Sequence, residues 1–208
     1  HDIEDRIVIL VDPMLATGTS LMLVYDALIR RAGEPEHTHF AAVFASEQGV
    51  DYVAASFVST KGDVVELRDF LNAHGGREID IIAKIENEEG VNNFDSILAC
   101  ADGIMIARGD LGNAVPLWQL PAIQKGIAAL CIARGKPFLV VTQLLASMEE
   151  RAVPTRAEVS DIFNAVLDGA WALMLTGETA AGRYPAEAMA YLCNTVVEAM
   201  RFLQMGKE

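Results

Sequence analysis

Three charged side chains suited to phosphoryl-transfer chemistry lie near the ends of two strand-like segments. Lys84 and Glu86 belong to the segment 83–87 (AKIEN), and Asp110 belongs to the glycine-containing segment 107–112 (ARGDLG). In a parallel barrel the carboxyl ends of the strands meet on one face, so these side chains should converge there. Two carboxylates can hold Mg²⁺ while a lysine neutralises charge on a transferring phosphoryl group. The same residues also fit an ordinary ion pair at a strand end beside two turn glycines.

A second stretch, residues 11–20, runs from the end of a strand-like segment through small residues into a helix. Backbone amides at such a helix start, together with hydroxyl side chains, can bind a phosphate monoester. The residues that would do so are Ala16, Thr17, Gly18, Thr19 and Ser20. Asp12, at the strand end, is placed to accept hydrogen bonds from ribose hydroxyls. A βα turn with an ordinary serine or threonine N-cap also explains this stretch.

Short apolar runs alternate with longer amphipathic segments, which predicts βα units around a parallel sheet. The predicted strands are 6–11, 52–57, 79–85, 103–107, 137–142 and 172–175, and the predicted helices are 20–31, 61–74, 92–99, 118–134, 156–168 and 184–202. Thr142 and Glu178 follow two of the later strands and should face the same end of the sheet. Residues 38–46 fit either a strand or part of a helix. We predict an α/β fold of parallel βα repeats, a partial or rebuilt TIM-barrel-like sheet surrounded by helices.

The composition excludes two classes of partner. The 208 residues contain 16 Lys+Arg and 29 Asp+Glu, a formal net charge of −13, which repels the backbone of nucleic acids. No apolar run reaches the roughly 18 residues needed to cross a bilayer, so we expect no membrane partner. Cys100, Cys131 and Cys193 are widely spaced in apolar stretches and predict reduced core thiols of a cytoplasmic protein.

Several of these motifs, in this order, resemble the catalytic barrel of the pyruvate kinases. They are AKIEN with EGV, DGIMIARGDLG, PTRAEVSD, NAVLDGA and GETAAGRYP, and the resemblance covers residues 47–202. It implies that Lys84 stabilises the transferring phosphoryl group and that Glu86 and Asp110 bind Mg²⁺. It also implies that Thr142 lies near the methylene carbon that is protonated. The backbone that would hold the phosphoenolpyruvate carboxylate consists of Ala107, Arg108, Gly109 and Asp110.

The motif DPMLATG, residues 12–18, resembles the phosphoribosyl diphosphate loop of uracil phosphoribosyltransferases. That resemblance covers residues 6–50. It implies that Asp12 binds ribose hydroxyls and that residues 16–20 bind the 5′-phosphate. No later segment resembles the uracil-binding region of that family.

Together the two resemblances predict one α/β domain, 1–208, built from a phosphoribosyltransferase-like fragment, 1–50, and a pyruvate-kinase-like half-barrel, 51–208. We therefore expect a chimera, recombined by engineering, that retains Mg²⁺ and phosphate-binding motifs but has no efficient catalysis. In pyruvate kinases the K⁺ ligands lie in an earlier part of the chain, so we expect the K⁺ site to be lost. The expected partners are small phosphorylated or carboxylate ligands, and a homo-oligomer would complete the sheet. Two alternatives stay open: pyruvate kinase-type transfer from phosphoenolpyruvate to ADP, and binding of phosphoribosyl diphosphate through the N-terminal loop.

Overall fold

Five short apolar runs form one parallel sheet in the computed structural model, which describes residues 51–205. The strands are β1 (Tyr52–Ala55), β2 (Asp80–Ile85), β3 (Gly103–Ala107), β4 (Phe138–Val141) and β5 (Ala172–Met174). Their order in the sheet is their order in the chain, and every neighbouring pair is parallel. Each crossover thus joins adjacent strands, as in a TIM barrel. The predicted α/β fold with parallel βα repeats is confirmed.

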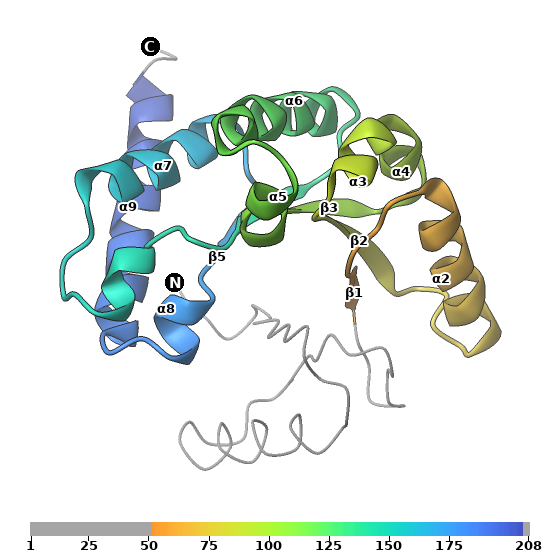
Figure 1. The fold of residues 1–208 in the computed structure, drawn as a ribbon, viewed down its shortest axis with the longest axis horizontal. Coiled ribbons are helices and arrows are strands. Elements are labelled where there is room, and N and C mark those ends of the chain that lie inside the picture. Colours follow the sequence, from red (N-terminus) through yellow and green to blue (C-terminus); the bar gives the residue numbers. More distant parts are fainter. Residues whose placement is uncertain (1–50, 206–208) are drawn as a thin grey trace.

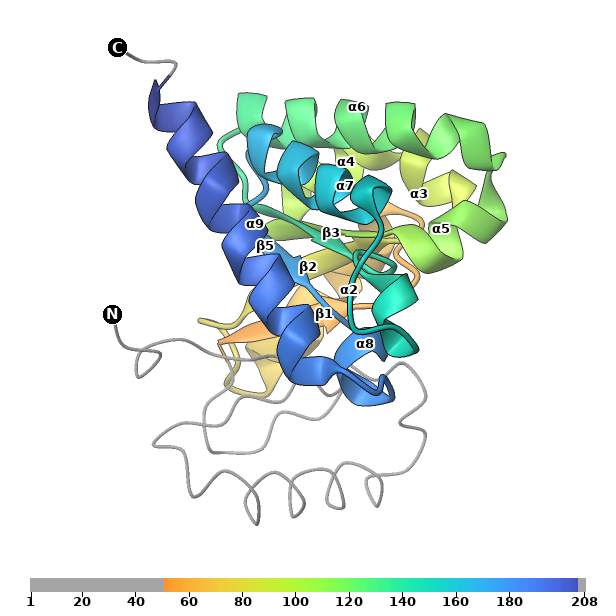
Figure 2. The same cartoon turned by 90° about the vertical axis from the view of Figure 1, so that its left-hand side faces the viewer.

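Helices connect the strands and lie along one side of the sheet, as α4, α6 and α7 show in Figures 1 and 2. The helices are α2 (Lys61–Ala73), α3 (Glu88–Asn92), α4 (Phe94–Cys100), α5 (Arg108–Ala114), α6 (Leu120–Ala133), α7 (Arg156–Leu167), α8 (Gly177–Ala180) and α9 (Pro185–Met205), with short 3₁₀ helices η2 (Leu117–Gln119) and η3 (Ala146–Glu149). Thr60 and Thr155 begin α2 and α7 with capping boxes. Gly75, Gly135 and Gly169 have positive φ angles after α2, α6 and α7, so they end these helices as left-handed caps.

Alternate strand residues separate the two faces of the sheet. In β2, Ile81, Ala83 and Ile85 pack into the large core between sheet and helices. On the other face, which we call the inner face, a smaller apolar cluster consists of Ile82, Met105, Ala107, Leu139 and Val141. Lys84 and Glu86 follow Ile82 at two-residue spacing and therefore belong to the inner face. The strand pattern thus directs both charged side chains away from the helices.

The sheet is strongly curved. Five strands spaced by about 4.8 Å would put the outer strands of a flat sheet about 19 Å apart. However, the ring centroids of Tyr52 in β1 and Trp171, just before β5, lie 6.2 Å apart. Side chains from the two outer strands of the described sheet meet because the sheet bends. This curvature is that of a barrel, although β1 and β5 are not paired with each other.

The cysteines differ in their surroundings. All three are free, but only Cys131 is fully buried, whereas Cys100 is half-buried and Cys193 is exposed on α9. Burial raises the pKa of the Cys131 thiol to about 11. The expectation of core thiols is therefore correct for Cys131 and wrong for Cys193.

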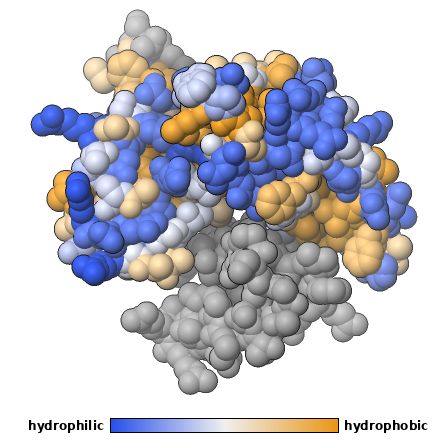
Figure 3. Space-filling view, in the orientation of Figure 1, coloured by the Kyte–Doolittle hydropathy of each residue, from blue (hydrophilic) through white to orange (hydrophobic). Residues whose placement is uncertain are grey.

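The surface is mixed in character. Figure 3 shows a largely hydrophilic face with an apolar area over α2, whose exposed apolar residues include Val65 and Phe70.

Within residues 51–205 we find no helix with the length and apolar character needed to cross a bilayer. The predicted elements 6–11, 20–31 and 38–46 lie outside the described residues.

Candidate active site

The register of the strands aligns the carboxyl ends of β2, β3 and β4. Lys84 pairs with Met105, and Ala107 pairs with Val141. The residues that directly follow these strands consequently lie side by side at one end of the sheet. This end carries the active site in barrel enzymes, because the loops there are free to vary.

Lys84 and Glu86 form an ion pair that is almost completely removed from solvent. The Lys84 Nζ lies 2.9 Å from Glu86 Oε1, and the two side chains are 7% and 2% exposed. The attraction between buried charges is stronger than in water, but each charge has lost its hydration. A positive and a negative group are therefore held together in a low-dielectric setting.

Ser56 and Phe57, the two residues that follow β1, form hydrogen bonds with this ion pair. The Lys84 ammonium donates to Ser56 Oγ at 3.0 Å, and the backbone N–H of Phe57 donates to Glu86 Oε2 at 2.5 Å. Phe57 has a φ of 54°, a left-handed conformation that is unusual for a bulky residue. Sequence reasoning missed both residues. Their contacts join segments 28 and 29 residues apart in the chain, which residue spacing does not reveal.

Asp110 lies in the first turn of α5 and is exposed. It forms no hydrogen bond or ion pair that we detect within residues 51–205, so its carboxylate is accessible to a cation. The preceding residue, Gly109, donates its backbone N–H to Thr142 Oγ1 at 2.7 Å. Thus the ends of β3 and β4 are joined by a hydrogen bond between two predicted site residues.

Thr142 is held in an uncommon backbone conformation. Its φ is 67°, and Gln143 follows with a φ of 53°. Left-handed residues other than glycine cost about 1–3 kcal/mol each and persist where the surroundings determine them. The Thr142 hydroxyl also donates to Val141 O at 2.6 Å. The threonine is therefore fixed by its contacts, which is common for residues of functional sites.

Ala107 ends β3 and Arg108 begins α5, and their side chains do not face the site in the same way. Ala107 is buried and belongs to the inner face. Arg108 turns its guanidinium to Thr142 O, at 2.8 Å from Nη2, and to Asp161 of α7, at 2.5 Å from Nη1. The backbone role predicted for residues 107–110 in carboxylate binding stays a prediction.

Glu178 has a structural environment. It is 1% exposed and accepts hydrogen bonds from the backbone N–H groups of Leu145 and Thr176, at 2.9 and 2.8 Å. Its carboxylate thereby connects α8 to the loop after β4. These contacts use both carboxylate oxygens, so Glu178 builds the loop that follows Thr142.

The carboxylates can be tested against the requirements of Mg²⁺. Within residues 51–205 no cluster of three or more His, Cys, Asp or Glu side chains is arranged to hold a metal ion. Mg²⁺ in phosphoryl-transfer enzymes is commonly bound by one or two carboxylates, with substrate phosphates and water as the other ligands. Glu86 and Asp110, at the ends of neighbouring strands, fit this donor set. The described residues do not bear on the expected loss of K⁺ binding, which stays a prediction.

The residues predicted for the second motif lie outside the described part of the chain. They are Asp12, Ala16, Thr17, Gly18, Thr19 and Ser20.

Comparison with known proteins gives one consistent result. Residues 28–189 match the family model described as the barrel domain of pyruvate kinase. A pyruvate kinase of Bacillus licheniformis is 53% identical over 152 residues, which cover 73% of this chain and 26% of that protein. One of Clostridium acetobutylicum is 48% identical over 165 residues, 79% of this chain and 35% of that protein. One of Schizosaccharomyces pombe is 52% identical over 163 residues, 78% and 32% of the two chains.

The chain therefore spans about a quarter to a third of the length of these relatives. These findings overturn the expectation of an engineered scaffold without efficient catalysis. Identity of about half to natural pyruvate kinases runs through most of the chain. The family match also begins at residue 28, inside the segment assigned to a phosphoribosyltransferase-like fragment, and nothing supports a chimera. Because this match covers most of the 208 residues, the chain belongs to the pyruvate kinase family, through its barrel domain.

Proposed function

We propose that this chain carries part of a pyruvate kinase-type active site, which transfers the phosphoryl group of phosphoenolpyruvate to ADP. The observation that supports the proposal most directly is the buried Lys84–Glu86 pair at the carboxyl end of β2. Asp110 and Thr142 follow the next two strands, so the four side chains belong to one end of one sheet. This is the arrangement that the family resemblance implies.

In the proposed reaction, the bond between phosphorus and the enol oxygen breaks while an ADP oxygen binds the phosphorus. The Lys84 ammonium offsets negative charge on the transferring group, and its low exposure strengthens that interaction. Gly109 N–H already donates to Thr142 Oγ1, so the donor proposed for the substrate carboxylate is the backbone N–H of Asp110, the next residue in the first turn of α5. The enolate that remains takes a proton from solvent water at its methylene carbon, next to Thr142, and becomes pyruvate.

Glu86 and Asp110 are the residues that would hold Mg²⁺. When bound, the cation neutralises phosphate charge and orients the substrate. Glu86 is already held by Lys84 and by the Phe57 N–H, whereas Asp110 is exposed. The two carboxylates thus contribute differently: Glu86 is preorganised and Asp110 is accessible.

Phosphorylated small molecules are the partners that we propose; cytoplasmic location and a homo-oligomer stay predictions.

The test is a coupled assay of pyruvate formation with phosphoenolpyruvate, ADP, Mg²⁺ and K⁺. We expect turnover by the full chain and a loss of about a hundredfold or more in Asp110→Asn, because one metal-binding carboxylate is removed. Asp110 is exposed, so the variant should fold normally. Asp69→Asn, an exposed aspartate on α2, is the matched control and should keep full activity. A cooperatively folded chain that forms no pyruvate, or an Asp110→Asn variant as active as the control, would overturn the proposal.

A further inference from the structure

Thr142 and Gln143 both have a left-handed backbone conformation. The Arg108 side chain, on the helix side of the sheet, binds the carbonyl oxygen of Thr142. Arg108 donates to the Thr142 carbonyl oxygen from Nη2 at 2.8 Å and from Nε at 3.3 Å. A β-branched residue at positive φ needs contacts of this kind to remain in that conformation. The guanidinium therefore fixes the carbonyl of the residue whose hydroxyl faces Gly109.

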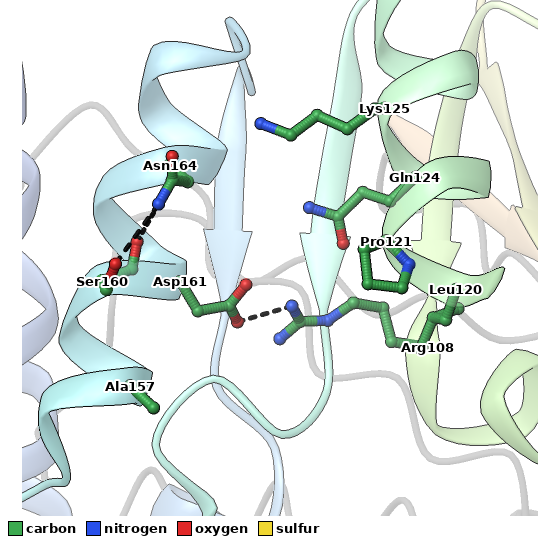
Figure 4. A pocket seen from close by; sticks show the side chains of 9 residues that line it. All are labelled: Arg108, Leu120, Pro121, Gln124, Lys125, Ala157, Ser160, Asp161 and Asn164. Atoms are coloured by element: carbon green, nitrogen blue, oxygen red, sulfur yellow. Dashed lines mark hydrogen bonds and ion pairs between the residues drawn. The ribbon is translucent and has the colours of Figure 1, made fainter. Parts of the chain in front are cut away.

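Arg108 is itself held from outside the sheet. Its Nη1 lies 2.5 Å from Asp161 Oδ2, and Asp161 belongs to α7. The Arg108 side chain is 9% exposed. The pair lines a pocket of about 410 Å³ between α6 and α7. Figure 4 shows Arg108 extending into this pocket from the sheet side and Asp161 from α7. A planar guanidinium bound in this way has its orientation determined by the carboxylate.

Hydrogen bonds from two consecutive residues, Arg108 and Gly109, join the end of β3 to Thr142 at the end of β4. The Arg108 side chain holds the Thr142 carbonyl, and the Thr142 hydroxyl accepts from the N–H of Gly109, the next residue after Arg108. Three guanidinium N–H groups of Arg108 are used inside the protein. They are consequently unsuited to bind a substrate at the same time.

We propose that Arg108 and Asp161 are positioning residues, which hold Thr142 and Gly109 in the geometry that receives the carboxylate and methylene end of phosphoenolpyruvate. This inference rests on the proposed function for the identity of the ligand. It assigns to the Arg108 side chain a role on the helix side of the sheet, away from the substrate. It also makes a residue of α7, far from the strand ends in the sequence, part of substrate recognition.

The experiment is amide hydrogen exchange of Gly109, followed by NMR in the full chain. We expect exchange to increase about tenfold or more in Asp161→Asn and in Arg108→Lys, because the Gly109 N–H loses a fixed acceptor. Lys125→Met is the matched control. Lys125 also bridges α6 and the end of α7, through Asp168 at 2.6 Å, but does not contact Thr142. Unchanged Gly109 exchange in both Asp161→Asn and Arg108→Lys would overturn the proposal.

Two further readouts separate positioning from general destabilisation and from the proposed function. Exchange of amides in α6 should stay within about twofold of the wild type, because the large core is not altered. In the coupled assay, Asp161→Asn should raise the KM for phosphoenolpyruvate and leave the KM for ADP unchanged. If the wild type forms no pyruvate, the proposed function fails, while Gly109 exchange still decides the positioning role. A parallel rise of exchange throughout α6 would show that Asp161 is structural and would also overturn the proposal.

Discussion

The most unusual residues of the molecule are the two charged side chains at the end of β2. Lys84 and Glu86 are both almost fully buried, and each satisfies the other. Burying an ion pair costs hydration that its mutual attraction only partly returns, so such a pair is seldom retained for stability alone. Its position on the inner face, beside the apolar cluster that includes Ile82 and Met105, agrees with a role in chemistry.

A double-variant cycle tests how strongly this pair is coupled. Lys84→Met should lower the free energy of unfolding by about 3–5 kcal/mol, because it leaves the Glu86 charge buried without its partner. Lys84→Met combined with Glu86→Leu should be more stable than either single variant, since both charges are removed. Urea unfolding of the four proteins measures the coupling. Additive effects of the two substitutions would contradict a desolvated, mutually dependent pair.

At the scale of elements, one close approach joins α3 to the segment that follows β1. Gly90 lies in α3, and a Cβ atom there would be 2.6 Å from the Val58 carbonyl oxygen. Asn87 caps this helix by accepting from the Gly90 N–H at 2.7 Å. The absence of a side chain at position 90 therefore lets α3 pack against the segment after β1, where Ser56 and Phe57 contact the Lys84–Glu86 pair.

Two glycine-to-alanine variants should have opposite effects on stability. Gly90→Ala should cost about 1–3 kcal/mol, because the backbone of Val58 cannot move aside easily. Gly126 lies in the interior of α6, and a methyl group added there would have no neighbouring atom within 4 Å, so Gly126→Ala should gain up to about 1 kcal/mol. Thermal or urea unfolding measures both. Equal changes in the two variants would contradict the packing described for α3.

The start of α7 predicts a pH dependence. Burial raises the pKa of Glu158, but hydrogen bonds from Ser147 and Thr155 outweigh it and hold that pKa below its ordinary value of 4.5. A carboxylate with a lowered folded-state pKa stabilises the protein above its unfolded-state pKa, and this contribution is lost as the pH falls through the folded-state pKa. The stability difference between wild type and Glu158→Gln should accordingly be largest near neutral pH and shrink below pH 4.5.

Urea unfolding at several pH values checks this expectation. Glu66→Gln is the control, because Glu66 is an exposed residue of α2 outside any capping box. Its effect should change little with pH. A Glu158→Gln effect that is constant from neutral to acidic pH would show that the hydrogen bonds, without the charge, account for the stabilisation.

Most elements could be predicted from local patterns, and the exceptions have physical causes. The predicted strand 52–57 ends at Ala55 because Phe57 adopts a left-handed φ. The helix α5 was not predicted, since its two glycines indicate a turn, but the fully buried Leu111 fixes it by packing. The single predicted helix 92–99 is instead α3 and α4, which meet at Asn93. For α5, a tertiary contact thus overrides the local preference.

The candidate site could be predicted only in part. The charged residues Lys84, Glu86 and Asp110 were found because they follow strands in a recognisable pattern. Ser56, Phe57 and Asp161 were not found, because their contacts join segments 28, 29 and 53 residues apart and leave no periodic signal. Residue spacing shows which groups can do chemistry, whereas their supports depend on the folded arrangement.

At the scale of the whole molecule, a long family match outweighs the resemblance of a short motif. The resemblance of residues 6–50 to a second family, carried by the motif at 12–18, led to the expectation of a chimera. The pyruvate kinase match extends over residues 28–189 and includes every strand that the structure describes. The strand order of the sheet, β1 to β5, and the curvature of the sheet are those of part of a barrel. The functional account therefore rests on the arrangement of strand ends in that sheet.

The most direct test of this account is a crystal structure of the chain with phosphoenolpyruvate and Mn²⁺ in place of Mg²⁺. Anomalous scattering at the manganese edge locates the cation independently of the protein atoms. We expect an anomalous peak within coordination distance, about 2.0–2.3 Å, of carboxylate oxygens of both Glu86 and Asp110. The phosphate of phosphoenolpyruvate should lie next to Lys84. Mn²⁺ bound elsewhere, with the ends of β2 and β3 empty, would contradict a pyruvate kinase-type site on this sheet.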